Sequence, residues 1–362
     1  MIKIISVVGA RPNFIKIAPL DRAFKSYPEV RHMICHTGQH FDNNMSIVFF
    51  EELEMPVPDF YLGISGGSHA VQTAGIMVEF EKILIKEKPN LVIVPGDVNS
   101  TMASALTASK LNIPVAHIES GLRSFDRTMP EEINRIVTDL LSEYLFVSES
   151  SGLANLKREG IDERKIFFVG NIMIDSLVYY QTKINNSGIR EKLKINEKKY
   201  CLCTFHRPSN VDNHENLNAI IDLLNELSEK FTVVFPMHPR TRQIYNKYKL
   251  NKLGPNLVIT EPFGYIDFLH LLANSELVIT DSGGIQEETT YLGIQCITVR
   301  DNTERPVTVE IGTNHLTGTD LARVRETTER ILNGAVKRGN IPDLWDGNTA
   351  KRIAGIIVNE FK

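Results

Sequence analysis

The sequence predicts an α/β protein made of two doubly wound, Rossmann-like domains that face a central cleft. Short runs rich in Val and Ile alternate with longer helical patterns along the chain, which is typical of parallel sheets covered by helices on both faces. The length of 362 residues is enough for roughly two domains of ordinary size. The strand-like runs also form two series, separated by the Gly170-Asn171 break and a charged stretch that ends near Lys199.

Each predicted strand is a short apolar run. In the first series the runs cover residues 3–8, 31–36, 91–95, 115–118, 144–147 and 166–169. In the second series they cover residues 200–204, 232–236, 257–260, 277–280 and 296–299. We therefore expect a first domain over residues 1–170 and a second over residues 171–347, with a last helix in residues 348–362 that packs back on the first domain.

The composition excludes several classes of protein. Hydrophobic residues at 42% and charged residues at 23% are typical of a folded, water-soluble chain. A formal net charge of -4 gives no basic excess for binding nucleic acid. The apolar run at the start is too short for a signal or membrane segment and is followed at once by Arg11 and Pro12. The expected location is the cytoplasm, without a membrane or nucleic-acid partner.

Neither a metal site nor a dinucleotide cofactor is expected. The first strand is followed by a single glycine, Gly9, so the Gly-x-Gly-x-x-Gly fingerprint of dinucleotide binding is absent. No pair of histidines comes with the further ligands that a metal needs. The four cysteines lie in predicted strands and are interpreted as reduced core residues. The histidine pairs are His36 with His40 and His206 with His214, and the cysteines are Cys35, Cys201, Cys203 and Cys296.

An apolar strand at residues 277–280 runs through Asp281 into Ser282, Gly283 and Gly284 and then into a helix. Glycines let a phosphate approach the backbone closely, and the N–H groups and dipole of the helix start favour its negative charge. One turn further on, Glu288 is placed to accept hydrogen bonds from a ribose diol. The segment predicts a site for a nucleotide diphosphate. A second glycine run, residues 64–68, follows no strand and is interpreted as a loop.

Ligands of doubly wound domains bind outside the carboxyl ends of the strands, where this chain carries several carboxylates. Asp97 and Glu119 follow two predicted strands of the first domain, and Glu131 follows Pro130 at a predicted helix start. Each also has a structural interpretation. Asp97 could cap a helix, Glu119 could pair with Arg123, and Glu131 or its neighbour Glu132 could simply complement the dipole of its helix.

The second domain offers groups suited to phosphate. His206 and Arg207 follow one predicted strand, and Arg305 follows the last one. Phe268 could stack on a base or belong to the core. One domain that holds a nucleotide diphosphate and another that offers carboxylates suit chemistry on a nucleotide sugar.

These motifs, taken in order, resemble those of the non-hydrolysing UDP-N-acetylglucosamine 2-epimerases along nearly the whole chain. The fold of that family, of the GT-B type, is shared with one large class of glycosyltransferases. The matching segments are residues 9–12 with Lys16, 36–40, 96–97, 117–124, 130–135, 206–207, 281–288 and 301–306.

The resemblance implies inversion at C2 of the sugar, through elimination of UDP to a 2-acetamidoglucal and its return to the other face. It implies acid or base roles for Asp97, Glu119 and Glu131, with His206 near the phosphates and no cofactor. It also implies a homodimer. The residues that it assigns to UDP binding are Arg11, Lys16, Ser282, Gly283, Gly284, Glu288 and Arg305.

Some segments depart from the pattern of many bacterial members. Pro208-Ser209-Asn210 follows His206-Arg207, and residues 39–42 and 66–69 also differ. These regions contribute to a regulatory substrate site in the bacterial enzymes, so the resemblance leaves open whether substrate activates this chain. Four alternatives stay open: a 2-epimerase of a UDP-diacetamido uronic acid, a hydrolysing 2-epimerase, a glycosyltransferase of the same architecture, and a nucleotide-sugar sensor without turnover.

Overall fold

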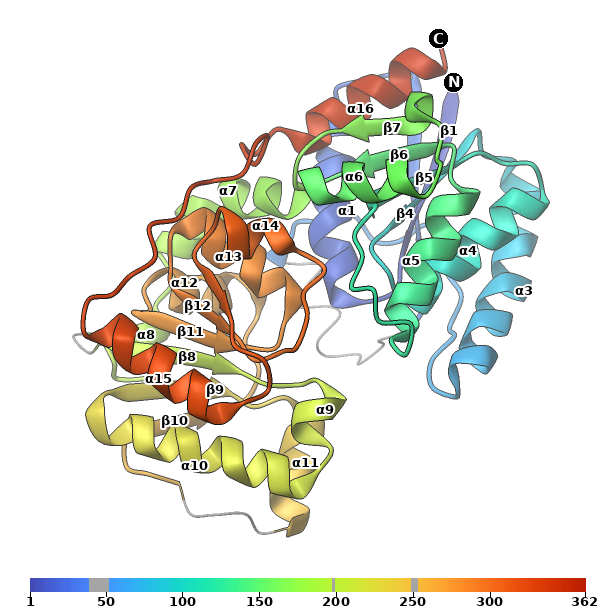
Figure 1. Cartoon of the computed structure of the whole chain (residues 1–362). Helices are drawn as coiled ribbons and strands as arrows, with labels where there is room; N and C mark the ends of the chain where they lie inside the picture. The colour runs from blue at the N-terminus through green and yellow to red at the C-terminus, as the bar shows by residue number, and fades with distance from the viewer. Residues whose placement is uncertain (39–51, 197–198, 249–252) are drawn as a thin grey trace. The chain divides into compact units, whose positions relative to one another are not determined.

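The computed structural model describes residues 1–38, 52–196, 199–248 and 253–362, which divide into two compact units (Figure 1). Unit 1 comprises Met1–Tyr179 and Asp343–Lys362, and unit 2 comprises Tyr180–Pro342. The first boundary lies inside helix α7 (Ile172–Asn185), further along the chain than the Gly170-Asn171 break. The last segment of the chain returns to unit 1.

Unit 1 is built on a seven-stranded sheet in the order β3-β2-β1-β4-β5-β6-β7, with every neighbouring pair parallel. The strands are β1 (Ile2–Val8), β2 (Val30–His36), β3 (Phe60–Tyr61), β4 (Leu91–Pro95), β5 (Val115–Ser120), β6 (Tyr144–Val147) and β7 (Ile166–Phe168). The direction in which successive strands are added changes between β1 and β4: β2 and β3 lie on one side of β1, and β4 to β7 lie on the other. In doubly wound sheets, ligands bind at the carboxyl ends beside such a reversal, so the loops that follow β1, β4 and β5 are the ones to inspect.

The helices of unit 1 cover both faces of this sheet: α1 and α16 pack together, and α3, α4 and α5 form a second layer (Figure 1). Their bounds are α1 (Arg11–Phe24), α3 (His69–Glu87), α4 (Asn99–Lys110), α5 (Pro130–Leu141), α6 (Ser150–Arg158), the 3-10 turn η1 (Glu163–Lys165) and α16 (Thr349–Glu360). Proline in the first turn helps to start α1 and α5. Asp175 accepts hydrogen bonds from the first N–H groups of α16, those of Thr349 and Ala350.

Unit 2 repeats the plan with a six-stranded parallel sheet in the order β10-β9-β8-β11-β12-β13. Its strands are β8 (Tyr200–Thr204), β9 (Thr232–Pro236), β10 (Leu257–Thr260), β11 (Leu277–Thr280), β12 (Cys296–Thr298) and β13 (Asn314–Leu316). The helices are α8 (Ile189–Lys192), α9 (Pro208–Val211), α10 (His214–Lys230), α11 (Pro239–Tyr248), α12 (Tyr265–Ala273), α13 (Gly283–Leu292), α14 (Pro306–Glu310) and α15 (Leu321–Leu332). The strand order reverses between β8 and β11.

All the predicted strands are confirmed, with ends that differ by no more than two residues. The sequence missed β3 and β13, two short edge strands with a single neighbour each. The four cysteines are free and buried in β2, β8 and β12, as expected. None of the helices in the described residues has the length and apolar content that a membrane crossing needs.

Candidate active site

The first cluster of site residues lies at the carboxyl ends of β4 and β5, which are neighbours in the sheet of unit 1. Asp97 is the second residue after β4, and Glu119 is the next to last residue of β5. Gly96 joins them, because its N–H donates to the carbonyl of Ile118 and its φ of +68° suits glycine. A Cβ at Gly96 would lie 3.1 Å from the Lys16 Nζ atom and 3.4 Å from the Glu119 Oε2 atom. The two strand ends are therefore packed closely.

Glu119 makes a buried ion pair with Lys16 of α1, and the two side chains are only 3% and 6% exposed. Its backbone has a φ of +68°, rare for a residue with a side chain, and the pairing of β5 with β6 shifts register between Ile118 and Ser120. Such strain persists only where the surroundings fix it. The alternative that pairs Glu119 with Arg123 is wrong, because Arg123 instead pairs with Asp139 and Glu159.

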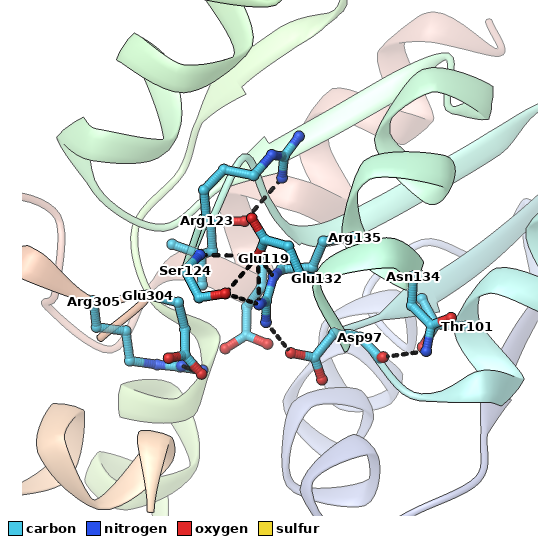
Figure 2. A network of polar contacts seen from close by, with 12 residues as sticks. Asp97, Thr101, Glu119, Arg123, Ser124, Glu132, Asn134, Arg135, Glu304 and Arg305 are labelled. Carbon is cyan, nitrogen blue, oxygen red and sulfur yellow. Dashed lines mark hydrogen bonds and ion pairs between the residues drawn. The ribbon is translucent and has the colours of Figure 1, made fainter. Parts of the chain in front are cut away.

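Asp97 is partly exposed, with 29% of its side chain accessible. The Arg135 Nη1 atom lies 2.5 Å from its carboxylate, and the Asn134 side chain donates to its backbone carbonyl at 2.8 Å (Figure 2). Both partners come from α5. The alternative role of Asp97 as a helix cap is wrong, since Val98 is the N-cap of α4.

The paired carboxylates at the start of α5 have different surroundings. Glu132 is buried and accepts hydrogen bonds from the N–H group of Ser124 and from Arg135 at 2.7 Å (Figure 2). It also accepts from the N–H group of Phe125. Burial by itself would raise the pKa of Glu132, but the bonds from Ser124 and Arg135 outweigh it and hold the pKa below its usual value. Glu131 is half-buried and makes no hydrogen bond or ion pair with the described residues. Glu132 therefore holds Arg135, whereas the carboxylate of Glu131 pairs with none of the described residues.

The loop after β1 is tied to the end of β4 by one side chain. The Asn13 Oδ1 atom accepts from the N–H groups of Gly9 and Ala10, and its Nδ2 atom donates to the carbonyl of Pro95. A Cβ at Gly9 would lie 2.1 Å from the Ser100 Oγ atom, so only glycine allows this approach. Arg11 begins α1 here, half-buried, and burial lowers its pKa. In the matching segment 36–40, residues 39 and 40 lie outside the described residues, as do residues 41 and 42.

In unit 2, Asp281 follows β11 and is completely buried. It accepts from the N–H groups of His206 and Arg207, from the Asn210 side chain, and from the His206 Nδ1 atom at 2.8 Å. Burial would raise the pKa of Asp281, but these donors outweigh it and lower the pKa. The His206 side chain is 47% exposed. Asp281 thus orients an imidazole whose Nε2 atom is left for a ligand. The sequence placed Asp281 in the motif but assigned it no role.

The predicted phosphate cradle begins α13. Ser282 is the N-cap, and its side chain makes no cap hydrogen bond. A Cβ at Gly283 would lie 2.7 Å from the Arg305 Nη1 atom, so the glycine lets this guanidinium approach the helix start. The Arg305 Nε atom pairs with Glu287 of the same helix at 3.0 Å. The helix start and Arg305 together form a positively polarised surface.

Two further residues complete this cluster: Arg300, which the sequence analysis missed, and Glu304, which lies in the matching segment 301–306 but was given no role. Glu304 is buried and contacts Arg300 at 2.7 Å, Arg305 at 3.2 Å and Arg207 at 3.7 Å. The Arg300 Nη1 atom is buried and donates to none of the described residues. Burial lowers the pKa of Arg300, and the two neighbouring guanidiniums add to that effect. A buried cation with an unused donor is a ready partner for an anion.

Glu288 lies on α13 and is almost fully buried. Burial, followed by the charge of Glu287, raises its pKa to about 8. Phe268, on α12, is half-buried and packs against the core cluster that contains Leu202 and Ile285. Its packing agrees with the core alternative. Among the described residues, no group of three His, Cys, Asp or Glu side chains could hold a metal ion.

The raised pKa of Glu288 predicts a pH dependence of stability. Between about pH 4.5 and about pH 8 the unfolded carboxyl is ionised while the folded one keeps its proton, so the free energy of unfolding should fall as pH rises through this window. Glu288→Gln removes this loss. Thermal unfolding should show the Tm of the variant rising relative to the wild type by about 2 °C or more across the window. The exposed Glu229→Gln is the control, and equal slopes for Glu288→Gln and the wild type would contradict the assignment.

Comparison with known proteins gives a consistent picture. The family model of UDP-N-acetylglucosamine 2-epimerase matches residues 22–358. A UDP-N-acetylglucosamine 2-epimerase of Methanococcus maripaludis is 43% identical over 372 aligned positions, which cover 100% of both chains. A UDP-2,3-diacetamido-2,3-dideoxy-D-glucuronate 2-epimerase of Pseudomonas aeruginosa is 42% identical over 339 positions, covering 92% of this chain and 94% of that protein.

Solved structures show the same similarity. The crystal structure of Methanocaldococcus jannaschii UDP-GlcNAc 2-epimerase in complex with UDP-GlcNAc and UDP has a TM-score of 0.92 and 43% identity, covering 99% of this chain and 100% of that one. A glycosyltransferase from Streptomyces nogalater has a TM-score of 0.53 at 13% identity, a likeness of fold alone that covers 100% of this chain and 99% of that one. The expected fold class, two parallel α/β sheets of the GT-B type, is confirmed.

Proposed function

This chain belongs to the UDP-N-acetylglucosamine 2-epimerase family, and on that premise we propose that it interconverts UDP-N-acetylglucosamine and UDP-N-acetylmannosamine as an isomerase, without a cofactor. The observation that carries the proposal is the grouping of Asp97 and Glu119 at neighbouring strand ends of unit 1, with α5 supplying Glu131 and the partners of Asp97. A sugar-transfer enzyme has no evident need for so many carboxylates.

The reaction requires a base, an acid and a stabilised leaving group. The C2 proton of the sugar is not next to a carbonyl, so it becomes acidic only as the bond from C1 to the UDP oxygen breaks. Anti elimination then gives UDP and a 2-acetamidoglucal, and UDP returns as a proton is delivered to the opposite face of C2. A positioned carboxylate and groups that bind the departing diphosphate must therefore act together.

In this proposal the groups of unit 2 bind UDP. The N–H groups at the start of α13, together with Arg305 and the buried Arg300, face the charge that develops on the diphosphate. His206, oriented by Asp281, presents its Nε2 atom to a phosphate oxygen. Glu288 binds the ribose diol, and contact with two hydroxyl donors would favour its ionised form.

The carboxylates of unit 1 move the protons. Asp97 and Glu131 are the accessible ones, and Glu119 is paired with Lys16. Lys16 in this proposal serves Glu119 rather than UDP directly. Arg11, at the start of α1, remains the candidate of unit 1 for a phosphate contact.

Proton exchange at C2 tests the proposal. The protein is incubated with UDP-N-acetylglucosamine in heavy water and followed by proton NMR. A second anomeric signal and deuterium at C2 are expected, because every turnover removes the C2 proton. A spectrum unchanged after long incubation would rule the activity out. Free UDP that accumulates in step with turnover would indicate a hydrolysing enzyme, and sugar transfer to an added acceptor would indicate a glycosyltransferase.

A second candidate substrate is a UDP-2,3-diacetamido-2,3-dideoxy uronic acid. The observation that favours it is the 42% identity to the Pseudomonas aeruginosa enzyme named for that sugar. The two sugars differ at C3 and C6, so the same reaction at C2 is possible for both. The groups that recognise C3 and C6 decide which sugar the protein prefers. Comparing kcat/KM for the two substrates in the same exchange assay decides between them.

We also propose that the protein is a homodimer. Val71, Val78 and Ile85 are seven residues apart on α3, which puts them near one face of the helix, and each side chain is more than half exposed. Exposed apolar rows of this kind are typical of surfaces that bind a partner. Light scattering coupled to size exclusion should give twice the mass of the chain, and a monomer mass at micromolar concentration would reject the dimer.

A further inference from the structure

Beneath the strand ends that carry Asp97 and Glu119, unit 1 buries a second histidine–carboxylate pair. His117 lies on β5, two residues before Glu119, and Asp139 lies on α5. Both side chains are fully buried, and the His117 Nδ1 atom is 2.6 Å from the Asp139 Oδ1 atom. Neither residue is accessible to a substrate, so any effect on the reaction has to pass through other groups.

One contact of this pair holds the peptide that precedes Asp97. The His117 Nε2 atom is 2.8 Å from the carbonyl oxygen of Gly96, and both groups are buried. Because Gly96 has a positive φ and Asp97 follows it directly, this hydrogen bond limits the directions in which the Asp97 side chain can leave the loop.

The other contacts hold the chain that follows Glu119. The Asp139 Oδ2 atom accepts from the N–H group of Gly121 at 3.1 Å and lies 2.7 Å from the Arg123 Nη1 atom. Gly121 has a φ of +80°, and a Cβ there would lie 2.4 Å from the carbonyl oxygen of Gly152. The pair therefore fixes the chain two residues before Glu119, at His117, and two residues after it, at Gly121.

The hydrogen-bond partners also define the direction of these contacts. A carbonyl oxygen can only accept, so the Nε2 atom facing Gly96 carries a proton. Burial would raise the pKa of Asp139, but His117 and Arg123 outweigh it and the pKa is lowered, so Asp139 is a carboxylate that also only accepts. His117 and Asp139 together therefore link the end of β4 to the chain that follows β5.

We propose that His117 and Asp139 form a positioning pair that sets the spacing of Asp97 and Glu119. The inference rests on the proposed epimerase function. It matters because a displacement of about 1 Å in a reacting group can lower a rate about 100-fold. The positive φ of Glu119 is unfavourable and needs continuous support from its surroundings.

Two variants of His117 separate the two contacts. His117→Asn keeps a donor near the Nδ1 position and loses the Gly96 contact, whereas His117→Gln keeps a donor near the Nε2 position and loses the Asp139 contact. We expect His117→Asn to lower kcat for C2 exchange about 100-fold. We expect KM and the Kd for UDP to stay within about threefold of the wild type, since the bound ground state is not touched. His117→Gln should retain more activity than His117→Asn.

His32 offers a matched control in the same unit. Its Nδ1 atom is 2.8 Å from Asp21, its Nε2 atom is 2.8 Å from the Ser6 Oγ atom, and its side chain is 5% exposed. It is paired with Ile4, away from the carboxyl ends of the strands. His32→Asn should lower the Tm as His117→Asn does but leave kcat within about threefold of the wild type. An equal loss of kcat in His117→Asn and His32→Asn would show that the loss comes from general destabilisation, and the positioning role of His117 would be rejected.

A spectroscopic measurement on the wild type does not depend on activity. Nitrogen-15 NMR of histidine-labelled protein should show one imidazole, absent from His117→Gln, whose Nε2 atom is protonated and hydrogen-bonded to the carbonyl of Gly96. An Nε2 atom without a proton there would overturn the proposed contact, whatever the activity of the variants. If the wild type shows no C2 exchange, the epimerase function fails; if it exchanges and His117→Asn exchanges equally well, only the positioning role fails.

Discussion

Asp97→Asn is expected to lower the rate of C2 proton exchange by about 10³-fold, within the range that general acid–base groups contribute. The amide has nearly the shape of the carboxylate, and its oxygen can still accept from the Arg135 guanidinium that lies 2.5 Å from Asp97. Asn134 bonds to the backbone of Asp97 and is unaffected. The loop should therefore keep its conformation while the group that exchanges protons is lost.

The binding of UDP separates this effect from misfolding. Isothermal titration should give a Kd for UDP close to that of the wild type, because the diphosphate groups belong to unit 2 in this proposal. Asp162→Asn is a suitable control, since it removes the same charge from an exposed turn of unit 1. Turnover that survives in Asp97→Asn would show that Glu119 and Glu131 are sufficient, and the role proposed for Asp97 would be withdrawn.

Lys16→Met is expected to destabilise unit 1 by about 3–5 kcal/mol, because removing one member of a buried ion pair leaves the other charge without a partner. The side chains of Lys16 and Glu119 are 6% and 3% exposed, so water cannot replace the missing ammonium without a rearrangement. Chemical denaturation measures the loss. Activity should fall as well, since Glu119 is among the proposed acid or base groups.

The double variant Lys16→Met with Glu119→Gln tests whether the unpaired charge of Glu119 causes the loss of stability. Neutralising both members removes the unpaired charge, so most of the lost stability should return, although activity should not. If Lys16 instead acts mainly on UDP, the single variant should be nearly as stable as the wild type and should bind UDP much more weakly. The two roles therefore give opposite results in denaturation and in titration.

The fold could be predicted from the sequence because its central strands are continuous apolar runs. Strands β8 and β11, for example, are buried on both faces by helices, so their pattern needs no knowledge of neighbours. The edge strands β3 and β13 are only two and three residues long. Their formation depends on pairing with β2 and β12 rather than on their own composition.

The positions of Asp97 and Glu119 at the strand ends could also be predicted from the sequence. The side chains that pair with the site residues could not. Asp97 and Glu119 lie at the carboxyl ends of adjacent strands in a parallel sheet, which brings them to one edge. The pairing of Glu119 with Lys16 depends on how α1 packs over the sheet, and the residues are 103 positions apart. The same holds for Asp281 with His206, which are 75 positions apart. Such pairings require the tertiary structure.

The sequence also does not show which of two similar side chains makes a given contact. Glu131 and Glu132 are neighbours of the same residue type. Only the direction of each side chain on α5 decides which one forms the ion pair with Arg135. Arg300 lies between β12 and the matching segment 301–306, and Glu304 lies inside that segment without an assigned role. The buried ion pair between Arg300 and Glu304 depends on the tertiary structure, so the sequence alone does not predict it.

The return of the last helix to unit 1 leads us to expect a particular order of folding during translation. The buried Trp345 donates to the carbonyl of Ser148, and α16 packs on α1, so unit 1 needs residues from both ends of the chain. Unit 2 is continuous from Tyr180 to Pro342. We expect nascent chains stalled beyond Pro342, with residue 342 clear of the exit tunnel, to protect unit 2 from protease before unit 1, and the reverse order would contradict this. The half of the molecule made first is then the last to mature.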